Sequence, residues 1–204
     1  MTTPRLTPRG AATRARIVDA AADLVQRHGV GETSLDAVLA ASRTSKSQLY
    51  HYFADKDALV LAVIDRQVER VLAAQGHTLH ELDSVAGLRR WRDAIVALQD
   101  GLGCVGGCPV GSLAAELAEL PTARERLDGA FTRWTAHLVD GFTTMQRRGD
   151  LDADSDPADL ATGVMAALQG GLLLTQTTRS TRPLRVALDM AIDHVAARVV
   201  AEPG

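Results

Sequence analysis

Aromatic residues are scarce in this chain of 204 residues, at 3% of the total. Sheet proteins draw on aromatic and β-branched side chains, whereas the alanine and leucine that abound here favour helices. Two cysteines are too few for the disulfide framework of a small secreted protein. The first 16 residues contain four arginines and no apolar run, which is not the pattern of a signal peptide. The composition therefore predicts an all-α protein of the cytoplasm.

The longest stretch without charge covers residues 160–178, which is long enough to span a membrane. It includes Gln169, Gln176 and four threonines, however, and the segments around it are amphipathic. We interpret it as a helix packed inside the protein and expect no membrane partner.

The spacing of apolar residues predicts about nine helices and no strands. Thr13 is the expected N-cap of the first helix, and Gly29 and Gly31 are expected to end it. The glycine-rich segment 101–109 is expected to be a loop. The predicted helices cover approximately residues 14–28, 35–42, 45–51, 55–75, 85–102, 110–120, 123–148, 156–178 and 184–201.

Charge is unevenly distributed along the chain. Residues 1–56 contain eight Lys and Arg against five Asp and Glu, a formal charge of +3, whereas residues 57–204 contain fourteen against twenty, a charge of −6. A basic segment on an acidic body is compatible with binding of a polyanion at one end, and equally with a basic tail on an unrelated helical domain.

Two short helices separated by about three residues, after a longer one, outline a helix-turn-helix. The second short helix is expected to turn Leu49 inward, so that its other face carries hydroxyls, an amide and a cation that suit base edges and phosphates. A helical hairpin with a solvated face has the same pattern. The outward residues are Thr44, Ser45, Lys46, Ser47, Gln48 and His51.

The segment 13–63 resembles the DNA-binding domain of the TetR/AcrR family of bacterial transcriptional regulators, above all in its Leu-Tyr-x-x-Phe-x-x-Lys-x-x-Leu spacing from Leu49 to Leu59. The resemblance implies phosphate contacts by Tyr50 and Lys56, and a hydroxyl from Thr33 or Ser34 at the start of the support helix. It further implies that Ser45, Lys46 and Gln48 face the groove and that His51 contacts the DNA backbone.

Arg43 departs from the family pattern, which usually has glycine at this place in the turn. A non-glycine residue in a left-handed conformation is strained by about 1 kcal/mol. We expect Arg43 either to contact a phosphate or to belong to a different turn, and Ser47 stands where the family often has a small residue.

The division expected from these patterns is a DNA-binding domain at residues 1–56, with a disordered basic arm at 1–12, and a helical body at residues 57–204. Small and apolar residues in segments 157–178 and 184–201 favour a homodimer interface, which a palindromic operator on double-stranded DNA requires. The resemblance implies a small-molecule effector bound in the body. Candidate lining residues, each of which also fits a plain core, are Trp91, Cys104, Phe131, Trp134, His137, Met145 and Met165.

The run from Gly107 to Leu117 is similar to the C-terminal domain of LmrA/YxaF-like members of the family. Cys104 and Cys108 fit a redox switch, a metal site or two small buried residues. No metal and no cofactor are expected, because zinc requires four ligands and the sequence contains no cofactor fingerprint.

These observations predict a dimeric regulator, most simply a repressor released from its operator by a small molecule. Two other classes stay open: an enzyme that uses the central cavity, and a purely structural helical dimer. The enzyme is disfavoured because the sequence has no Ser-His-Asp grouping and no paired carboxylates in an apolar setting.

Overall fold

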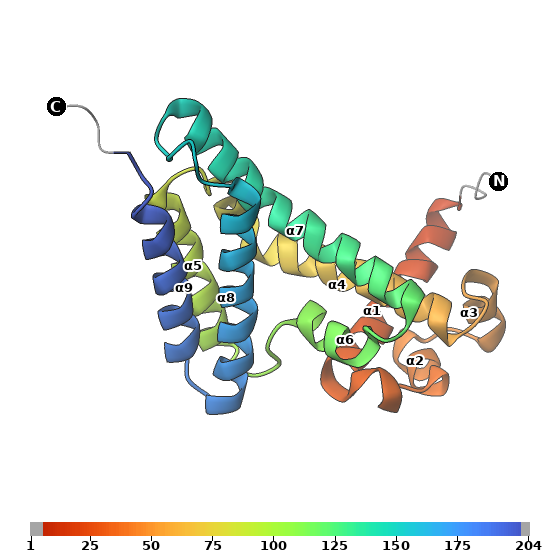
Figure 1. Cartoon of the computed structure of the whole chain (residues 1–204). Coiled ribbons are helices and arrows are strands. Elements are labelled where there is room, and N and C mark those ends of the chain that lie inside the picture. Colours follow the sequence, from red (N-terminus) through yellow and green to blue (C-terminus); the bar gives the residue numbers. More distant parts are fainter. Residues whose placement is uncertain (1–5, 201–204) are drawn as a thin grey trace. The chain divides into compact units, whose positions relative to one another are not determined.

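The computed structural model describes residues 6–200 and is all-α, as predicted (Figure 1). An isolated antiparallel bridge joins Leu151 to Val199. The elements of this described part are α1 (Pro8–Glu32), α2 (Leu35–Ser42), α3 (Lys46–Tyr52), α4 (Lys56–Gln75), a 3₁₀ helix η1 (Gly76–His80), α5 (Val85–Gly101), α6 (Pro109–Leu117), α7 (Pro121–Arg148), α8 (Pro157–Thr178) and α9 (Arg182–Ala196).

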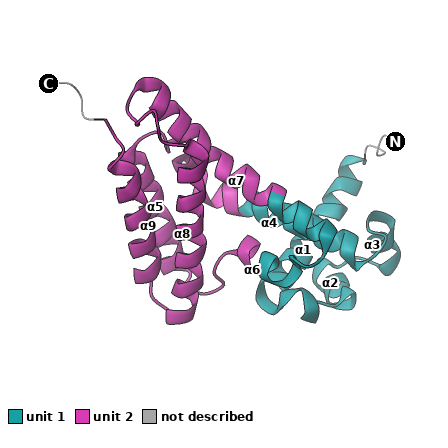
Figure 2. Ribbon diagram, viewed as in Figure 1, with its two compact units in different colours: residues 1–70, 112–128 teal, residues 71–111, 129–204 magenta. Residues whose placement is uncertain are grey.

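The chain divides into two compact units (Figure 2). Unit 1 comprises Met1–Arg70 and Ser112–Asp128, and unit 2 comprises Val71–Gly111 and Gly129–Gly204. This division falls within α4, after Arg70, whereas the boundary expected from the sequence lies at the first residue of that helix, Lys56.

The first helix begins earlier than predicted. Thr7 is its N-cap, with the hydroxyl oxygen accepting from the Gly10 N–H, and Pro8 occupies the first helical position, where its missing N–H costs nothing. Residues 8–12 are therefore helical rather than part of a disordered arm, and residues 1–5 lie outside the described range. Thr13 is not a cap: it lies inside the helix, and its hydroxyl donates to the Arg9 carbonyl oxygen.

Unit 1 is held together by an apolar core and by ion pairs between α1 and α4. The Asp19 carboxylate accepts from both Arg66 and Arg70 at 2.7 Å, and Asp23 accepts from Arg70 at 2.6 Å. Burial raises the pKa of the Asp19 carboxyl, but the two guanidinium groups lower it by more, so that the net pKa lies below its ordinary value. This network fixes α1 against α4, the two helices that flank the short helices between them.

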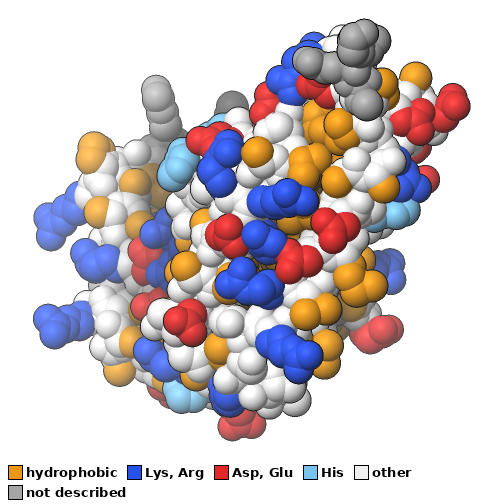
Figure 3. Space-filling model, turned by 90° about the vertical axis from the view of Figure 1, so that its left-hand side faces the viewer, with side chains coloured by type: hydrophobic (Ala, Val, Ile, Leu, Met, Phe, Trp, Pro, Cys, Tyr) orange, Lys and Arg blue, Asp and Glu red, His pale blue; other side chains and the backbone are white. Residues whose placement is uncertain are grey.

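Unit 2 contains α5, α8 and α9 side by side (Figure 1). A side chain at Gly171 of α8 would place its Cβ 2.8 Å from the Cα of Leu184, so glycine allows α8 and α9 to pack closely. Across α5 and α9, Arg89 pairs with Asp193, Arg92 with Asp189 and Arg185 with Asp93. Blue and red side chains are accordingly interleaved on the face that Figure 3 shows.

Helix α8, whose one charged residue is Asp159, is long and apolar enough to meet a length-and-composition criterion for a membrane span. Its buried residues, which include Leu168 and Leu172, pack within unit 2. The final helix ends at Ala196, not near residue 201 as predicted, because the chain turns there and the Val200 N–H donates to the Asp150 carbonyl oxygen.

Candidate nucleic-acid interface and effector site

Helices α2 and α3 form the predicted helix-turn-helix in unit 1. Val38 of α2 and Leu49 of α3 are completely buried and hold the pair against the rest of the unit. Ser45 is the N-cap of α3 and forms a capping box with Gln48: the Gln48 N–H donates to Ser45 Oγ at 3.2 Å, and the Ser45 N–H donates to Gln48 Oε1 at 2.9 Å. These bonds stabilise a helix of seven residues that would be too short to persist alone.

The outward face of α3 carries the predicted polar side chains. Lys46, Ser47, Gln48 and His51 are exposed, and 46% of the Tyr50 surface is accessible. Two of the predicted contacts already have partners, since Gln48 caps the helix and Thr44 Oγ1 lies 2.7 Å from Ser42 Oγ. The exposed side chains of Lys46, Tyr50 and His51 offer a cation, a phenol and an imidazole for contact.

Arg43 is in the left-handed conformation, with φ 52° and ψ 46°, which is the conformation that suits the glycine usual at this place. It is the C-cap of α2, and its N–H donates to the Ala40 carbonyl oxygen. The turn thus keeps the expected geometry with a strained residue, and the Arg43 side chain is exposed beside α3.

The remaining predicted DNA contacts lie at helix starts. Ser34 is exposed and is the N-cap of α2, with its hydroxyl oxygen accepting from the Ala37 N–H, whereas Thr33 is buried and donates to the Gly29 carbonyl oxygen. Of the two predicted hydroxyls, that of Ser34 is therefore the more accessible to solvent. Lys56 is the first residue of α4 and is half-buried.

Two of the predicted effector contacts share one hydrogen-bond acceptor. Trp91 and Trp134 are buried in unit 2, and both indole N–H groups donate to one atom, Gln75 Oε1, at 2.8 and 3.3 Å. The Gln75 amide nitrogen donates in turn to the Val71 carbonyl oxygen at 3.0 Å. The role of Gln75 was not predicted, because its only signal in the sequence is a polar residue at the end of an amphipathic helix.

The other predicted lining residues differ in burial. Cys104, Met145 and Met165 are buried, while Phe131 and His137 are half-buried. His137 faces His80 with the ring centroids 5.9 Å apart, in a hollow of about 230 Å³ that contains none of the other six residues. The structure brings Trp91 and Trp134 together, and does not gather the full set around that hollow.

The glycine-rich loop holds two buried free cysteines. Cys108 Sγ accepts from the Gly111 N–H at 3.3 Å, and burial raises the pKa of the thiol. The neutral thiol is therefore favoured, which works against a thiolate-based redox switch. Among the residues that the structure describes, no three His, Cys, Asp or Glu side chains form a group suited to a metal ion.

Two buried polar atoms of unit 2 have no hydrogen-bond partner in the structure: Gln99 Oε1 and Thr175 Oγ1. Both residues are almost fully inaccessible. Each belongs to a segment that meets the cysteine loop, because the Cys104 N–H donates to the Gln99 carbonyl oxygen and Arg179 donates to the Cys104 carbonyl oxygen at 3.0 Å. Unsatisfied buried polar atoms are rare and call for an explanation.

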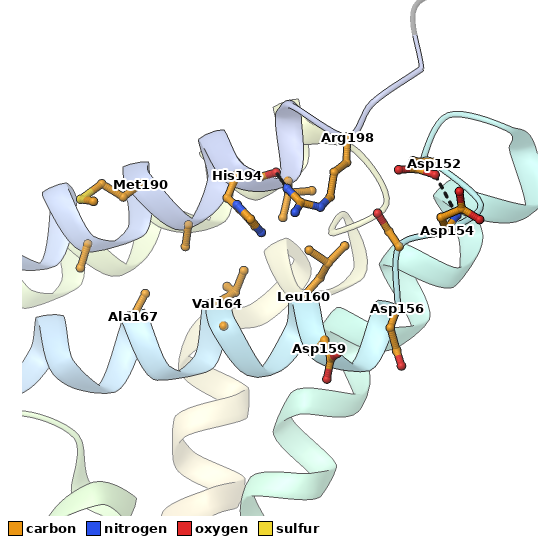
Figure 4. A pocket seen from close by; sticks show the side chains of 15 residues that line it. Asp152, Asp154, Asp156, Asp159, Leu160, Val164, Ala167, Met190, His194 and Arg198 are labelled. Carbon is orange, nitrogen blue, oxygen red and sulfur yellow. Dashed lines mark hydrogen bonds between the residues drawn. The ribbon is translucent and has the colours of Figure 1, made fainter.

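A groove of about 760 Å³ runs between α8 and α9 (Figure 4). Leu160, Val164 and Ala167 line it from α8, and Met190, His194 and Arg198 line it from the other side, while aspartates stand at one end. Met190 is 71% exposed, and Leu173 of α8 is 64% exposed. Unit 2 thus presents large apolar side chains beside small residues on the outer surface of these helices.

Comparisons with known proteins agree with this geometry. Residues 17–63 match the family described as bacterial regulatory proteins of the tetR family, and residues 84–191 match the tetracyclin repressor-like C-terminal domain. The transcriptional regulator AcuR of Cereibacter sphaeroides is 30% identical over 189 residues, which cover 89% of this chain and 84% of that protein.

The regulator LmrA of Bacillus subtilis is 25% identical over 175 residues, which cover 84% of this chain and 90% of that protein, in keeping with the similarity of the C-terminal run. The crystal structure of a regulatory protein TetR from Rhodobacter sphaeroides is 25% identical, covers 92% of this chain and 99% of its own, and superimposes with a TM-score of 0.77. These relatives are transcriptional regulators and not enzymes. The chain therefore belongs to the TetR family of transcriptional regulators and carries its DNA-binding helix-turn-helix.

Proposed function

We propose that this protein is a cytoplasmic, homodimeric repressor that binds a near-palindromic operator through α3 and leaves it when a small molecule binds in unit 2. The observation that carries the proposal is the outer face of α3, where exposed Lys46, Tyr50 and His51 stand over a fully buried Leu49. A helix anchored by one apolar residue and polar on its other face is suited to the major groove.

Operator binding is tested with the DNA fragments that the purified protein retains from its own genome. Lys56→Ala is expected to weaken binding and to reduce the slope of log affinity against log salt by about 1, because one phosphate contact is lost. Arg133→Ala is the matched control, since it removes one exposed cation from unit 2. Equal affinity and equal salt slopes in the two variants would reject the assigned phosphate contact.

The α8–α9 groove supports a second copy of the chain as its occupant. Small residues such as Gly163, Ala167 and Ala191 line it and permit close helix approach, while Met190 supplies a large apolar knob. A two-fold axis would place each groove against the same surface of the partner, which is the usual arrangement of a dimer.

The dimer is tested by sedimentation of Met190→Glu. A carboxylate on this surface is expected to shift the protein to monomer and to abolish cooperative operator binding. Leu120→Glu is the control, because Leu120 is 52% exposed and lies in unit 1. A dimeric Met190→Glu protein would place the interface elsewhere.

The unpartnered Gln99 Oε1 and Thr175 Oγ1 support an effector site in unit 2 near the cysteine loop. A bound molecule with hydrogen-bonding groups would satisfy these atoms, whereas the two tryptophan N–H groups are already occupied by Gln75. We therefore place the polar end of the effector near α5 and α8.

Small molecules that release the retained DNA identify the effector, and Thr175→Val then tests its site. Removing an unpartnered buried hydroxyl is expected to leave folding and DNA binding intact while weakening the response. Thr177→Val, which alters an exposed hydroxyl two residues further along α8, is the control. If both variants respond like the unmodified protein, Thr175 does not contact the effector.

A further inference from the structure

Helix α1 is interrupted just before the helix-turn-helix. Gly29 has φ 81° and ψ 168°, a conformation that glycine alone adopts without strain. The next residue, Val30, directs its N–H to Glu116 Oε2 at 2.7 Å, and the Thr33 hydroxyl donates to the Gly29 carbonyl oxygen at 2.7 Å. Residues 29–34 thus form a corner from which α2, capped by Ser34, leaves α1.

Glu116 belongs to the last turn of α6 and to unit 1. A carboxylate near the C-terminus of a helix is locally unfavourable, because it faces the negative end of the helix dipole. Leu113 and Leu117 of the same helix are buried and fix this part of α6. The Val30 N–H therefore gives the carboxylate a favourable partner that its own helix does not.

The approach of the two segments also depends on glycine. A Cβ at position 29 would lie 3.1 Å from Glu116 Oε1 and 3.2 Å from Oε2. The positive φ of Gly29 and its lack of a side chain therefore both allow the Glu116 carboxylate to approach the backbone here.

We propose that Glu116 is a positioning residue for operator binding: its carboxylate holds the corner at residues 29–34 and so sets the direction in which α2 and α3 leave α1. The residue does not contact DNA in this scheme. The inference rests on the proposed function, because it assigns a role in operator binding to a residue outside the helix-turn-helix. It also gives a role to the run from Gly107 to Leu117, of which Glu116 is the last residue but one.

The sign of the effect on DNA affinity separates positioning from simple electrostatics. Removing a negative charge from a DNA-binding unit strengthens attraction to a polyanion, so electrostatics alone predicts tighter binding by Glu116→Ala. Loss of a charge-assisted hydrogen bond that positions α2 and α3 predicts binding weaker by about tenfold. The salt slope is expected to stay unchanged, because no phosphate contact is removed.

Two further variants complete the test with the retained DNA fragments. Glu116→Gln keeps an acceptor oxygen for the Val30 N–H and is expected to restore most of the affinity. Glu119→Ala removes an equal charge from an exposed residue just after α6 and is expected to bind at least as tightly as the unmodified protein. Equal affinity of Glu116→Ala and Glu119→Ala would overturn the inference.

Amide hydrogen exchange supplies a readout that does not use DNA. In Glu116→Ala the Val30 amide is expected to exchange about tenfold faster, with little change in the thermal midpoint, and Glu116→Gln is expected to restore slow exchange. Unchanged exchange at Val30 would also overturn the inference. The unmodified protein could retain no DNA even though the Val30 amide exchanges faster in Glu116→Ala. In that case the proposed function would be wrong, but the contribution of Glu116 to the structure of residues 29–34 would be confirmed.

Discussion

Gln75 accepts from both tryptophans of the chain, and its replacement by methionine gives the sharpest test of the core of unit 2. Gln75→Met keeps the length of the side chain and removes the acceptor, so that two buried indole N–H groups lose their partner. An unsatisfied buried donor costs about 1–3 kcal/mol. The bond from Trp91 is short at 2.8 Å and that from Trp134 is longer at 3.3 Å, so we expect the free energy of unfolding to fall by about 3 kcal/mol.

The assay is urea unfolding followed by tryptophan fluorescence, which reports on the two affected rings directly. Protein concentration is held constant because association between copies of a chain makes apparent stability depend on concentration. Gln26→Met serves as the control, since Gln26 is exposed on α1 and its replacement is expected to change stability by less than about 0.5 kcal/mol. A loss below about 1 kcal/mol for Gln75→Met would refute the contribution of these two hydrogen bonds to stability.

Three further predictions follow from local features. The pKa of Asp19 is lowered in the folded protein, so its ion pairs stabilise the fold above about pH 4, and this stabilisation is lost as the pH falls through the folded pKa. In Asp19→Asn the free energy of unfolding is therefore expected to depend less on pH in this acidic range. Burial raises the pKa of the Cys108 thiol, so alkylation by iodoacetamide at pH 7.5 is expected to be slow in the native protein and fast in urea, and equal rates would contradict the burial. Arg43→Gly removes the strain of a left-handed non-glycine residue and is expected to raise the free energy of unfolding by about 0.5 kcal/mol, after the entropic cost of glycine is subtracted. Operator affinity is expected to fall if Arg43 contacts a phosphate. A lower free energy of unfolding in this variant would contradict the claim that Arg43 is strained.

Periodicity sufficed to place the nine α-helices found within residues 6–200, because each buries one apolar face. It placed the ends less well. The first helix begins at Pro8, although the predicted N-cap was Thr13. The sequence alone does not distinguish an N-cap threonine from a threonine inside a helix whose hydroxyl donates to the preceding turn. The end of α9 depends on the pairing of Val199 with Leu151, which lies 48 residues away in the chain and has no local signal.

The helix-turn-helix face was predictable because its residues lie within one short segment. The buried part of unit 2 was not: two tryptophans suited a ligand site in sequence, and only the fold shows that both donate to Gln75. Glu116 was equally hidden, because its partner is a backbone N–H that becomes available through the break at Gly29.

The capping box that joins Ser45 to Gln48 has a consequence for the thermodynamics of operator recognition. A recognition helix that is already folded in the free protein does not have to fold when it binds in the major groove. Association should then proceed with a small heat-capacity change and little dependence on temperature, as rigid docking does, rather than with the large negative value that accompanies coupled folding.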